Sequence, residues 1–273
     1  MSFQTLPGSN EGGDRPYWLY ALLAIGAFLA VLIAVNGIFA QVFTTVIAGT
    51  GITIFVTMAG YAIALTVGLG IALLGLSGSQ ILRQIARFYV EVFRGVPVLV
   101  LLFYIAFVGA PGVVAAYNFL AGPLIRAGYL DTLLVREVSL MWRAIIALGL
   151  GYSPFIAEIF RAGIQSVDKG QIEAAKALGL SRSQRFRLIV FPQAIRVIFP
   201  PLSNDFVAMT KDSSLVSVLG VADITQMGKV YASGSFRFFE TYSIIAFIYL
   251  MLTIGLSLLL RGFERRMRGR HLQ

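Results

Sequence analysis

Residues Thr50–Leu76 read TGITIFVTMAGYAIALTVGLGIALLGL, a run without a single charged side chain. This run lies inside a longer uncharged stretch of 67 residues between Arg15 and Arg83. A helix that crosses a bilayer needs about 20 apolar residues, so the stretch has room for more than one crossing. The whole chain has the same character. Its 58% apolar residues, 13% charged residues and mean hydropathy of +0.82 exclude an ordinary soluble domain.

Six apolar segments are long enough to span, and each should be helical because an open strand in hydrocarbon leaves its backbone groups unpaired. We therefore predict an all-α integral membrane protein, a polytopic bundle of about six spanning helices. The first segment is too long, and too weakly preceded by Lys or Arg, for a cleaved signal peptide, so we expect it to be retained. The predicted spans are Trp18–Phe39, Thr50–Leu76, Pro97–Tyr117, Met141–Ile164, Leu202–Val221 and Thr241–Leu260.

Lys and Arg residues are distributed unevenly over the connections between these spans. Of the 22 basic residues, 16 fall on one side and 5 on the other, while Lys211 falls within a span. Because basic residues near helix ends are retained in the cytoplasm, both termini and residues 165–196 are predicted to be cytoplasmic. The net charge of +9 is then a topology signal, with anionic membrane lipid as a secondary partner. Nucleic-acid binding is not expected, because the basic tail lacks interleaved aromatic residues.

Residues 165–196 carry the signals of two short helices outside the membrane. Asp168 with Gln171, and Ser181 with Gln184, each have the form of a capping box at a helix start. Gly179 is placed to end the first helix in a left-handed conformation. We expect a helix–turn–helix in the cytoplasm whose second helix stops at Pro192.

The anchors of a longer pattern fall in this loop, with the spacing E-A-A-x₃-G-x₉-I-x-[LF]-P. They are Glu173-Ala174-Ala175, Gly179, Ile189 and Phe191-Pro192. The pattern resembles the EAA loop of importer-type ABC permeases, in which the loop forms a coupling helix that docks on a cytoplasmic ATPase. The resemblance implies the same ATPase-coupling role here for Glu173, Ala174, Ala175, Lys176, Ala177, Leu178, Gly179 and Leu180.

Further blocks narrow the resemblance to the permeases of polar amino acid ABC importers, the group with glutamine, histidine, arginine and glutamate systems. These blocks are Phe93–Pro97, Tyr152–Gly163, Pro200–Leu202, Lys211–Leu215 and Leu260–Arg266. The resemblance implies an importer-type ABC permease fold with a core of five helices. The chain then divides into a cytoplasmic tail at 1–17, an added N-terminal spanning helix at 18–39, the permease domain at 50–262 and a basic cytoplasmic tail at 263–273. The external connection Ala110–Leu140 is long for this family.

The resemblance also implies a function and partners. The chain would translocate polar amino acids across the bacterial cytoplasmic (inner) membrane. Its partners would be cytoplasmic ATP-binding subunits that carry ATP and Mg, a second permease copy, identical or related, and an extracytoplasmic amino-acid-binding protein. The chain itself has no phosphate-binding loop, no catalytic triad and no metal-ligand spacing, so we expect it to be neither an enzyme nor a holder of a cofactor or metal.

Ionisable residues within the spans are costly in hydrocarbon and usually face a cavity or a partner. Glu158, Asp205, Lys211 and Asp212 are such residues, and with Ser213 and Ser214 they form the predicted substrate pathway. Asp205 could accept a substrate ammonium, and the two serines could donate to its carboxylate. A structural role stays open: Lys211 or Asp212 could fix a kink, and Glu158 could pair with Arg161, three residues away on one helix face.

Two other classes of function stay open at this point. In a gradient-driven secondary transporter or channel, Lys211 and Asp212 would form an ion or proton relay and the cytoplasmic loop would be purely structural. In a membrane anchor or sensor, the chain would carry no substrate flux. Energy coupling distinguishes the first of these from an ATP-driven permease, because an uncoupler would then stop transport.

Overall fold

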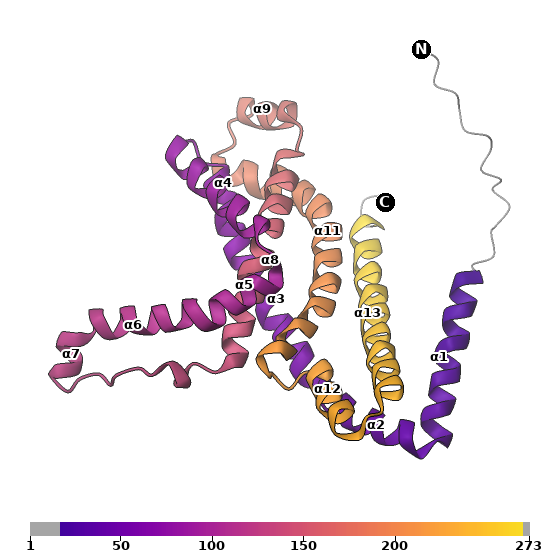
Figure 1. The fold of residues 1–273 in the computed structure, drawn as a ribbon. Coiled ribbons are helices and arrows are strands. Elements are labelled where there is room, and N and C mark those ends of the chain that lie inside the picture. The colour runs from indigo at the N-terminus through magenta and orange to yellow at the C-terminus, as the bar shows by residue number, and fades with distance from the viewer. Residues whose placement is uncertain (1–16, 270–273) are drawn as a thin grey trace, which may run out of the picture.

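The computed structural model describes residues 17–269, and the regular structure of these residues is helical throughout (Figure 1). The ends of both predicted tails, at 1–16 and 270–273, lie outside the described residues. The helices are α1 (Tyr17–Val35), α2 (Gly37–Ile47), α3 (Thr50–Gly75), α4 (Gln80–Gly95), α5 (Val98–Tyr104), α6 (Ala110–Leu120), α7 (Gly122–Arg126), α8 (Leu140–Gln165), α9 (Lys169–Ala177), α10 (Arg182–Arg185), α11 (Phe191–Asp212), α12 (Ile224–Ser235) and α13 (Phe238–Gly269). Short π-helical turns at Ile105–Gly109 and Phe186–Val190 and 3₁₀ turns at Val135–Glu137 and Ser213–Leu219 lie between them.

Five helical segments in the described part of the chain are long and apolar enough to cross a membrane, as expected for the five-helix core. They are Gly37–Gly75, Val98–Leu120, Leu140–Gln165, Arg182–Leu219 and Phe238–Arg266. A further apolar helix, Tyr20–Val35, is shorter than these five. The all-α polytopic fold predicted from the sequence is therefore present.

The first predicted span ends earlier than expected. Asn36 interrupts the helix, and its side chain accepts a hydrogen bond of 3.0 Å from the backbone N–H of Ile38, which starts α2. Residues 37–39 therefore belong to the next helical segment and not to the added helix predicted at 18–39. Leu29 and Leu32 of α1 pack against the apolar cluster of α2 and α13.

The centre of the bundle is the crossing of α3 and α8, where Gly60, Gly68 and Gly149 let the two helices approach closely. A Cβ at Gly68 would lie 2.8 Å from the Cγ2 of Ile156, and one at Gly149 would lie 3.0 Å from the carbonyl oxygen of Gly60. The glycines of α3 thus serve helix packing at the positions that face α8. Gly70, on the same helix, has no neighbour that a Cβ would meet.

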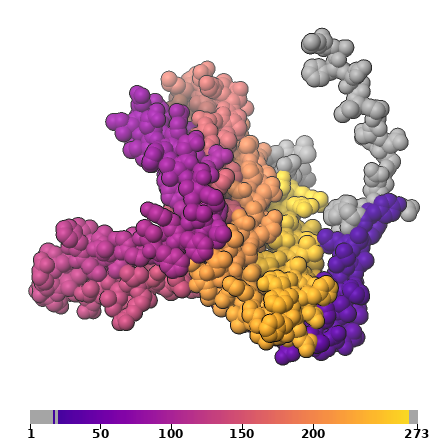
Figure 2. All heavy atoms as spheres, in the orientation of Figure 1, coloured from indigo at the N-terminus to yellow at the C-terminus, as the bar shows by residue number. Residues whose placement is uncertain are grey.

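Helices α6 and α7 leave the bundle as an arm, which Figures 1 and 2 show as a separate projection. Arg143 fixes its base, because this buried side chain donates hydrogen bonds to the carbonyl oxygens of Ala106, Val135 and Val138. Near the tip, the Asn118 side chain pairs with both backbone groups of Leu133, at 2.8 and 2.9 Å. The long connection expected from the sequence is thus an ordered element with its own hydrogen bonds.

Helix α11 begins before the position that the sequence analysis gave for its span. The predicted stop at Pro192 is wrong: Pro192 lies in the first turn of α11, directly after the π-helical turn Phe186–Val190, and Pro200 and Pro201 lie inside the same helix. The chain is therefore helical from Arg182 to Leu219. Helices α4 and α12 were not predicted as elements. In Figure 1, α9, the start of α1 and the end of α13 all lie at the same end of the bundle.

Candidate functional site

The EAA segment forms α9, a short helix that stands out from the end of the bundle (Figure 1). The side chain of Asp168 accepts a hydrogen bond of 3.2 Å from the backbone N–H of Gln171 and caps the start of the helix. The expected capping box is only half formed, because the Gln171 side chain bonds elsewhere. It accepts a hydrogen bond of 2.6 Å from the amide of Gln193 on α11, which ties the two helices together.

The end of α9 is closed by a Schellman motif. Gly179 has a φ of +77°, as predicted for a left-handed cap. Its N–H donates to the carbonyl of Lys176 at 3.0 Å, and the N–H of Leu180 donates to that of Ala175 at 3.1 Å. Both bonds of the second capping box, between Ser181 and Gln184, are present at 2.9 and 3.3 Å. The shape of α9 is therefore fixed by its own backbone and side chains.

The residues of α9 divide into an inner and an outer set. Ala175 is 3% exposed and faces the chain itself, so its small side chain serves the packing of the loop. Glu173, Ala174, Lys176, Ala177 and Gly179 are exposed, and Leu178 is exposed to 82%. A leucine held outward by a rigid turn outside the predicted spans suits an apolar pocket on another protein. Leu178 belongs to the predicted ATPase-coupling residues, but no feature of the sequence sets it apart from its neighbours.

Asp205 lies in the middle of the bundle, among α3, α8 and α11. Its side chain lies near those of Tyr61 on α3 and Tyr152 on α8. The hydroxyl of Tyr152 donates a hydrogen bond of 2.7 Å to Oδ2 of Asp212, and the hydroxyl of Tyr61 donates one of 2.7 Å to the carbonyl of Leu202. These four side chains form a polar group between α3, α8 and α11.

One atom of this cluster has no partner. Oδ2 of Asp205 is buried and makes no hydrogen bond in the described part of the chain. Buried polar atoms in folded proteins are nearly always paired, so an unpaired carboxylate oxygen within a span indicates a position where a ligand group can bind. Tyr61 and Tyr152 were missed as site residues, because their nearness to Asp205 depends on which helices pack together.

The other predicted pathway residues occupy different surroundings. Lys211 is exposed and Ser214 is partly exposed. Ser213 is fully buried, and its hydroxyl donates to the carbonyl of Thr210 at 2.7 Å, which is a bond within the turn itself. Asp212 has a partner on another helix, because its carboxylate accepts the hydrogen bond from the hydroxyl of Tyr152 on α8.

Glu158 is not part of this cluster. It forms an ion pair with Arg161 on the same face of α8, as the spacing of three residues predicts, and Arg161 also donates to Gln165 at 3.1 Å. The pair lines a cavity between α3, α4 and α8 that Asp205 does not reach. Among the described residues no group of three or more His, Asp and Glu side chains is arranged to hold a metal ion.

The chain shares most of its length with permeases of known sequence. It is 37% identical over 225 residues to the probable amino-acid permease protein YxeN of Bacillus subtilis, covering 82% of this chain and 92% of the relative. It is 33% identical over 222 residues to the glutamine transport system permease protein GlnP of Escherichia coli, covering 81% and 92%.

The fold is also that of a solved structure, described as an amino acid ABC transporter with histidines. That chain has 36% sequence identity and a TM-score of 0.68, and the match covers 83% of this chain and 96% of the other. A family model described as "Binding-protein-dependent transport system inner membrane component" matches residues 64–269, well over half of the chain. The protein is therefore a member of the family of inner membrane components of binding-protein-dependent transport systems.

Proposed function

We propose that this chain is the membrane-spanning permease subunit of an ATP-driven importer of polar amino acids. Its relatives are permease subunits, and two of them are named for amino acids or glutamine. A further relative is an arginine transport system permease protein of Bacillus subtilis, 30% identical over 224 residues. These names share a class of substrate, polar amino acids, and differ within it.

The observation that carries the proposal is the geometry of α9. This helix is capped at both ends, projects from the bundle and exposes Leu178. Packing of the bundle does not explain why Leu178 is held outward. Such a rigid projection suits a contact that transmits force from another protein. We infer that α9 docks on a separate ATPase, which binds ATP and Mg, and that Leu178 enters a pocket there.

The remaining partners follow from the same proposal. The importer contains a second permease copy and an extracytoplasmic protein that delivers the amino acid. The end of the bundle that bears α9 faces the cytoplasm of the bacterial cell, in agreement with the 16 to 5 division of basic residues. Both termini are then cytoplasmic, which reporter fusions at the two ends would test.

The substrate route runs past Asp205. Its unpaired carboxylate oxygen is the acceptor that we assign to the ammonium group of an amino acid, with the side chains of Tyr61 and Tyr152 nearby. A buried carboxylate facing a cation recovers the interaction that it lost on leaving water.

The source of energy tests the proposal as a whole. The permease is reconstituted in vesicles with its ATPase and binding protein, and uptake of radiolabelled polar amino acids is measured. We expect uptake to require hydrolysable ATP, to stop with an ATPase that cannot hydrolyse it, and to continue when a protonophore removes the ion gradient. Uptake that survives loss of the ATPase and stops with the protonophore would instead establish a gradient-driven transporter.

A further inference from the structure

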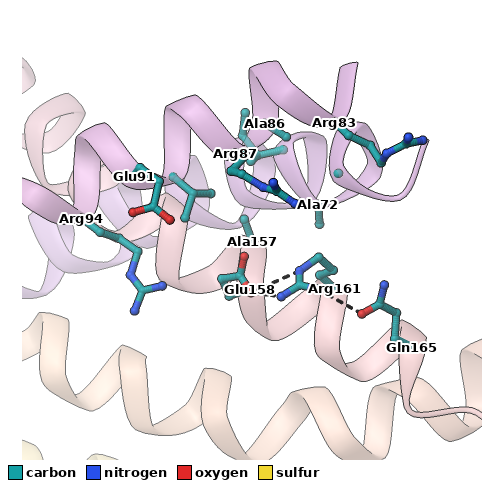
Figure 3. A pocket seen from close by; sticks show the side chains of 13 residues that line it. Ala72, Arg83, Ala86, Arg87, Glu91, Arg94, Ala157, Glu158, Arg161 and Gln165 are labelled. Carbon is teal, nitrogen blue, oxygen red and sulfur yellow. Dashed lines mark hydrogen bonds and ion pairs between the residues drawn. The ribbon is translucent and has the colours of Figure 1, made fainter. Parts of the chain in front are cut away.

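A second polar site lies at the end of the bundle that bears α9. It is a cavity of about 500 Å³ between the last turns of α3, the inner face of α4 and the last turns of α8 (Figure 3). Four arginines line it, Arg83, Arg87 and Arg94 from α4 and Arg161 from α8, together with Glu91 and Glu158. The ionised side chains of this lining therefore carry a net charge of +2.

The protein itself uses three of the four guanidinium groups. Arg161 pairs with Glu158, Arg83 donates to the carbonyl oxygens of Ser77 and Gly78 at 2.9 and 2.8 Å, and Arg94 lies 5.3 Å from the ring centre of Phe155. Arg87 makes no hydrogen bond or ion pair in the described part of the chain. Figure 3 shows its side chain extending from α4 into the space between α4 and α8. A guanidinium group without a protein partner, beside three others in a cavity, is suited to an anion.

The walls of the cavity are partly apolar. Ile71, Ala72, Ala86, Val90 and Ala157 line it between the charged groups. The opposite face of α4 exposes a continuous apolar stripe, with Ile81 and Phe88 each exposed to 72% and Ile85 between them to 51%. An amphipathic helix of this kind lies at the boundary between lipid and water, with its apolar face in the lipid.

The position of α4 in the chain agrees with such a location. It connects the end of one predicted span, at Gly75, to the start of the next, at Val98, so it begins at the membrane surface. That surface is the one facing α9, where the leaflet of a bacterial membrane carries anionic headgroups. The arginine cluster and the apolar stripe are thus presented to the same lipid boundary.

We propose that the cavity between α3, α4 and α8 is a binding site for a phosphate-bearing anion, with Arg87 as its main ligand. Guanidinium binds phosphate through two parallel N–H donors, and this geometry favours phosphate over a spherical anion. The phosphate can belong to an anionic lipid headgroup or be free in the cytoplasm. The apolar walls suit a ligand with a glycerol and acyl portion. The site does not include Asp205, so it is independent of the substrate route.

The experiment uses the assembled complex of permease and ATPase in lipid nanodiscs of three kinds. One contains phosphatidylcholine alone, the second contains phosphatidylcholine with phosphatidylglycerol, and the third contains phosphatidylcholine with inorganic phosphate in the buffer. The readouts are the midpoint temperature of unfolding and, by native mass spectrometry, the phosphatidylglycerol retained on the released complex. We expect the wild type to be stabilised by phosphatidylglycerol and to retain it.

The variant Arg87→Gln removes the free guanidinium without breaking a contact within the protein. We expect it to raise the phosphatidylglycerol fraction needed for half of the stabilisation by about fivefold or more. The control is Arg265→Gln, which removes the same charge from an exposed position of α13 outside the cavity, and it should leave this fraction unchanged.

The outcomes distinguish a lipid phosphate, a free phosphate and the absence of a site. Stabilisation by phosphatidylglycerol that Arg87→Gln weakens identifies a lipid as the source of the phosphate. Stabilisation by inorganic phosphate alone, lost in Arg87→Gln, identifies the free anion. If neither ligand acts, or if Arg87→Gln and Arg265→Gln weaken binding equally, the cavity is not a site and the effect is one of general surface charge.

Discussion

Asp205 is the residue on which the proposed substrate route depends. Its side chain lies near Tyr61 and Tyr152, and one of its carboxylate oxygens is buried without a partner in the described part of the chain. A role in binding a cationic group explains both its position and its missing partner.

Asp205→Asn should weaken substrate binding and leave the structure intact, because asparagine has nearly the same size and replaces the charged carboxylate with a neutral amide. A charged hydrogen bond contributes about 1.5–3 kcal/mol, so the amino acid concentration for half-maximal stimulation of the ATPase should rise by roughly tenfold or more. The measurement is ATP hydrolysis by the reconstituted complex over a range of substrate concentrations.

The matched control is Asp131→Asn, on the exposed part of the arm, which should behave as the wild type. Unchanged stimulation of an Asp205→Asn complex that assembles normally would remove Asp205 from the route.

Features that depend on residues close together in the chain could be predicted from the sequence. The caps at Asp168 and Ser181, the left-handed Gly179 and the pair of Glu158 with Arg161 all depend on neighbours within four residues, and the structure contains them. The partners of a residue on another helix could not be found in this way. The tyrosines beside Asp205 are examples, since no local pattern links positions so far apart.

At the scale of the element, the crossing of α3 and α8 holds the bundle together. The two helices approach through glycines, and the largest buried side chains around them include Leu102, Ile145 and Leu148. The close approach depends on the absence of a Cβ at Gly68. A Cβ added there would lie 2.9 Å from the backbone carbonyl oxygen of Ser153. A backbone atom at the centre of a packed bundle cannot move aside cheaply.

Gly68→Ala should therefore destabilise the permease by about 1–3 kcal/mol, the usual cost of overpacking a filled interior. Gly70→Ala is the matched control, two residues away on the same helix, where a Cβ meets nothing within 4 Å. We expect its stability to equal or slightly exceed that of the wild type. Thermal unfolding of the two purified variants in detergent makes the comparison. Equal stability of both would show that the helices separate easily at Gly68.

Helix α4 shows where reading elements from the sequence failed. Its apolar residues recur at the spacing of one helix face: Ile81, Ile85, Phe88 and Val92. The opposite face bears Arg83, Arg87 and Arg94, which line the cavity. This periodicity predicts an amphipathic helix. It was overlooked because the segment was treated as a connection between spans. The arginines of α4 that predict a cytoplasmic location for this segment are the same arginines that line the cavity.

At the scale of the whole molecule, the chain consists of a permease core with two extensions. The family match begins at residue 64, which leaves α1 and α2 before it. The arm α6–α7 projects to the side away from α1 in Figure 2, braced by Arg143 and Asn118. The composition predicted the class of protein and its helix content, since hydropathy alone limits what a chain can do in lipid. It gave no information on the direction of the arm, which depends on packing.

We propose a mechanical link between these features. Movements that accompany ATP hydrolysis in the ATPase pass through α9 to α11, the helix that carries Asp205. Gln193 links α9 to α11, the helix on which Asp205 lies. A movement of the coupling helix would therefore act directly on the substrate route. This link gives the account its central claim, that α9 is a contact with the ATPase and not an element that the membrane domain needs for folding.

Ala174→Trp tests this claim most directly, because Ala174 is exposed on α9 whereas the neighbouring Ala175 is buried. Membrane insertion, copurification of the ATPase and amino acid uptake are measured together, with Ala127→Trp on the exposed arm as the matched control. The account predicts normal insertion for both variants. For Ala174→Trp alone it predicts that association with the ATPase is weakened roughly five- to hundredfold, with loss of uptake, because a bulky misfit in an interface costs about 1–3 kcal/mol. Wild-type association and uptake in Ala174→Trp would contradict it.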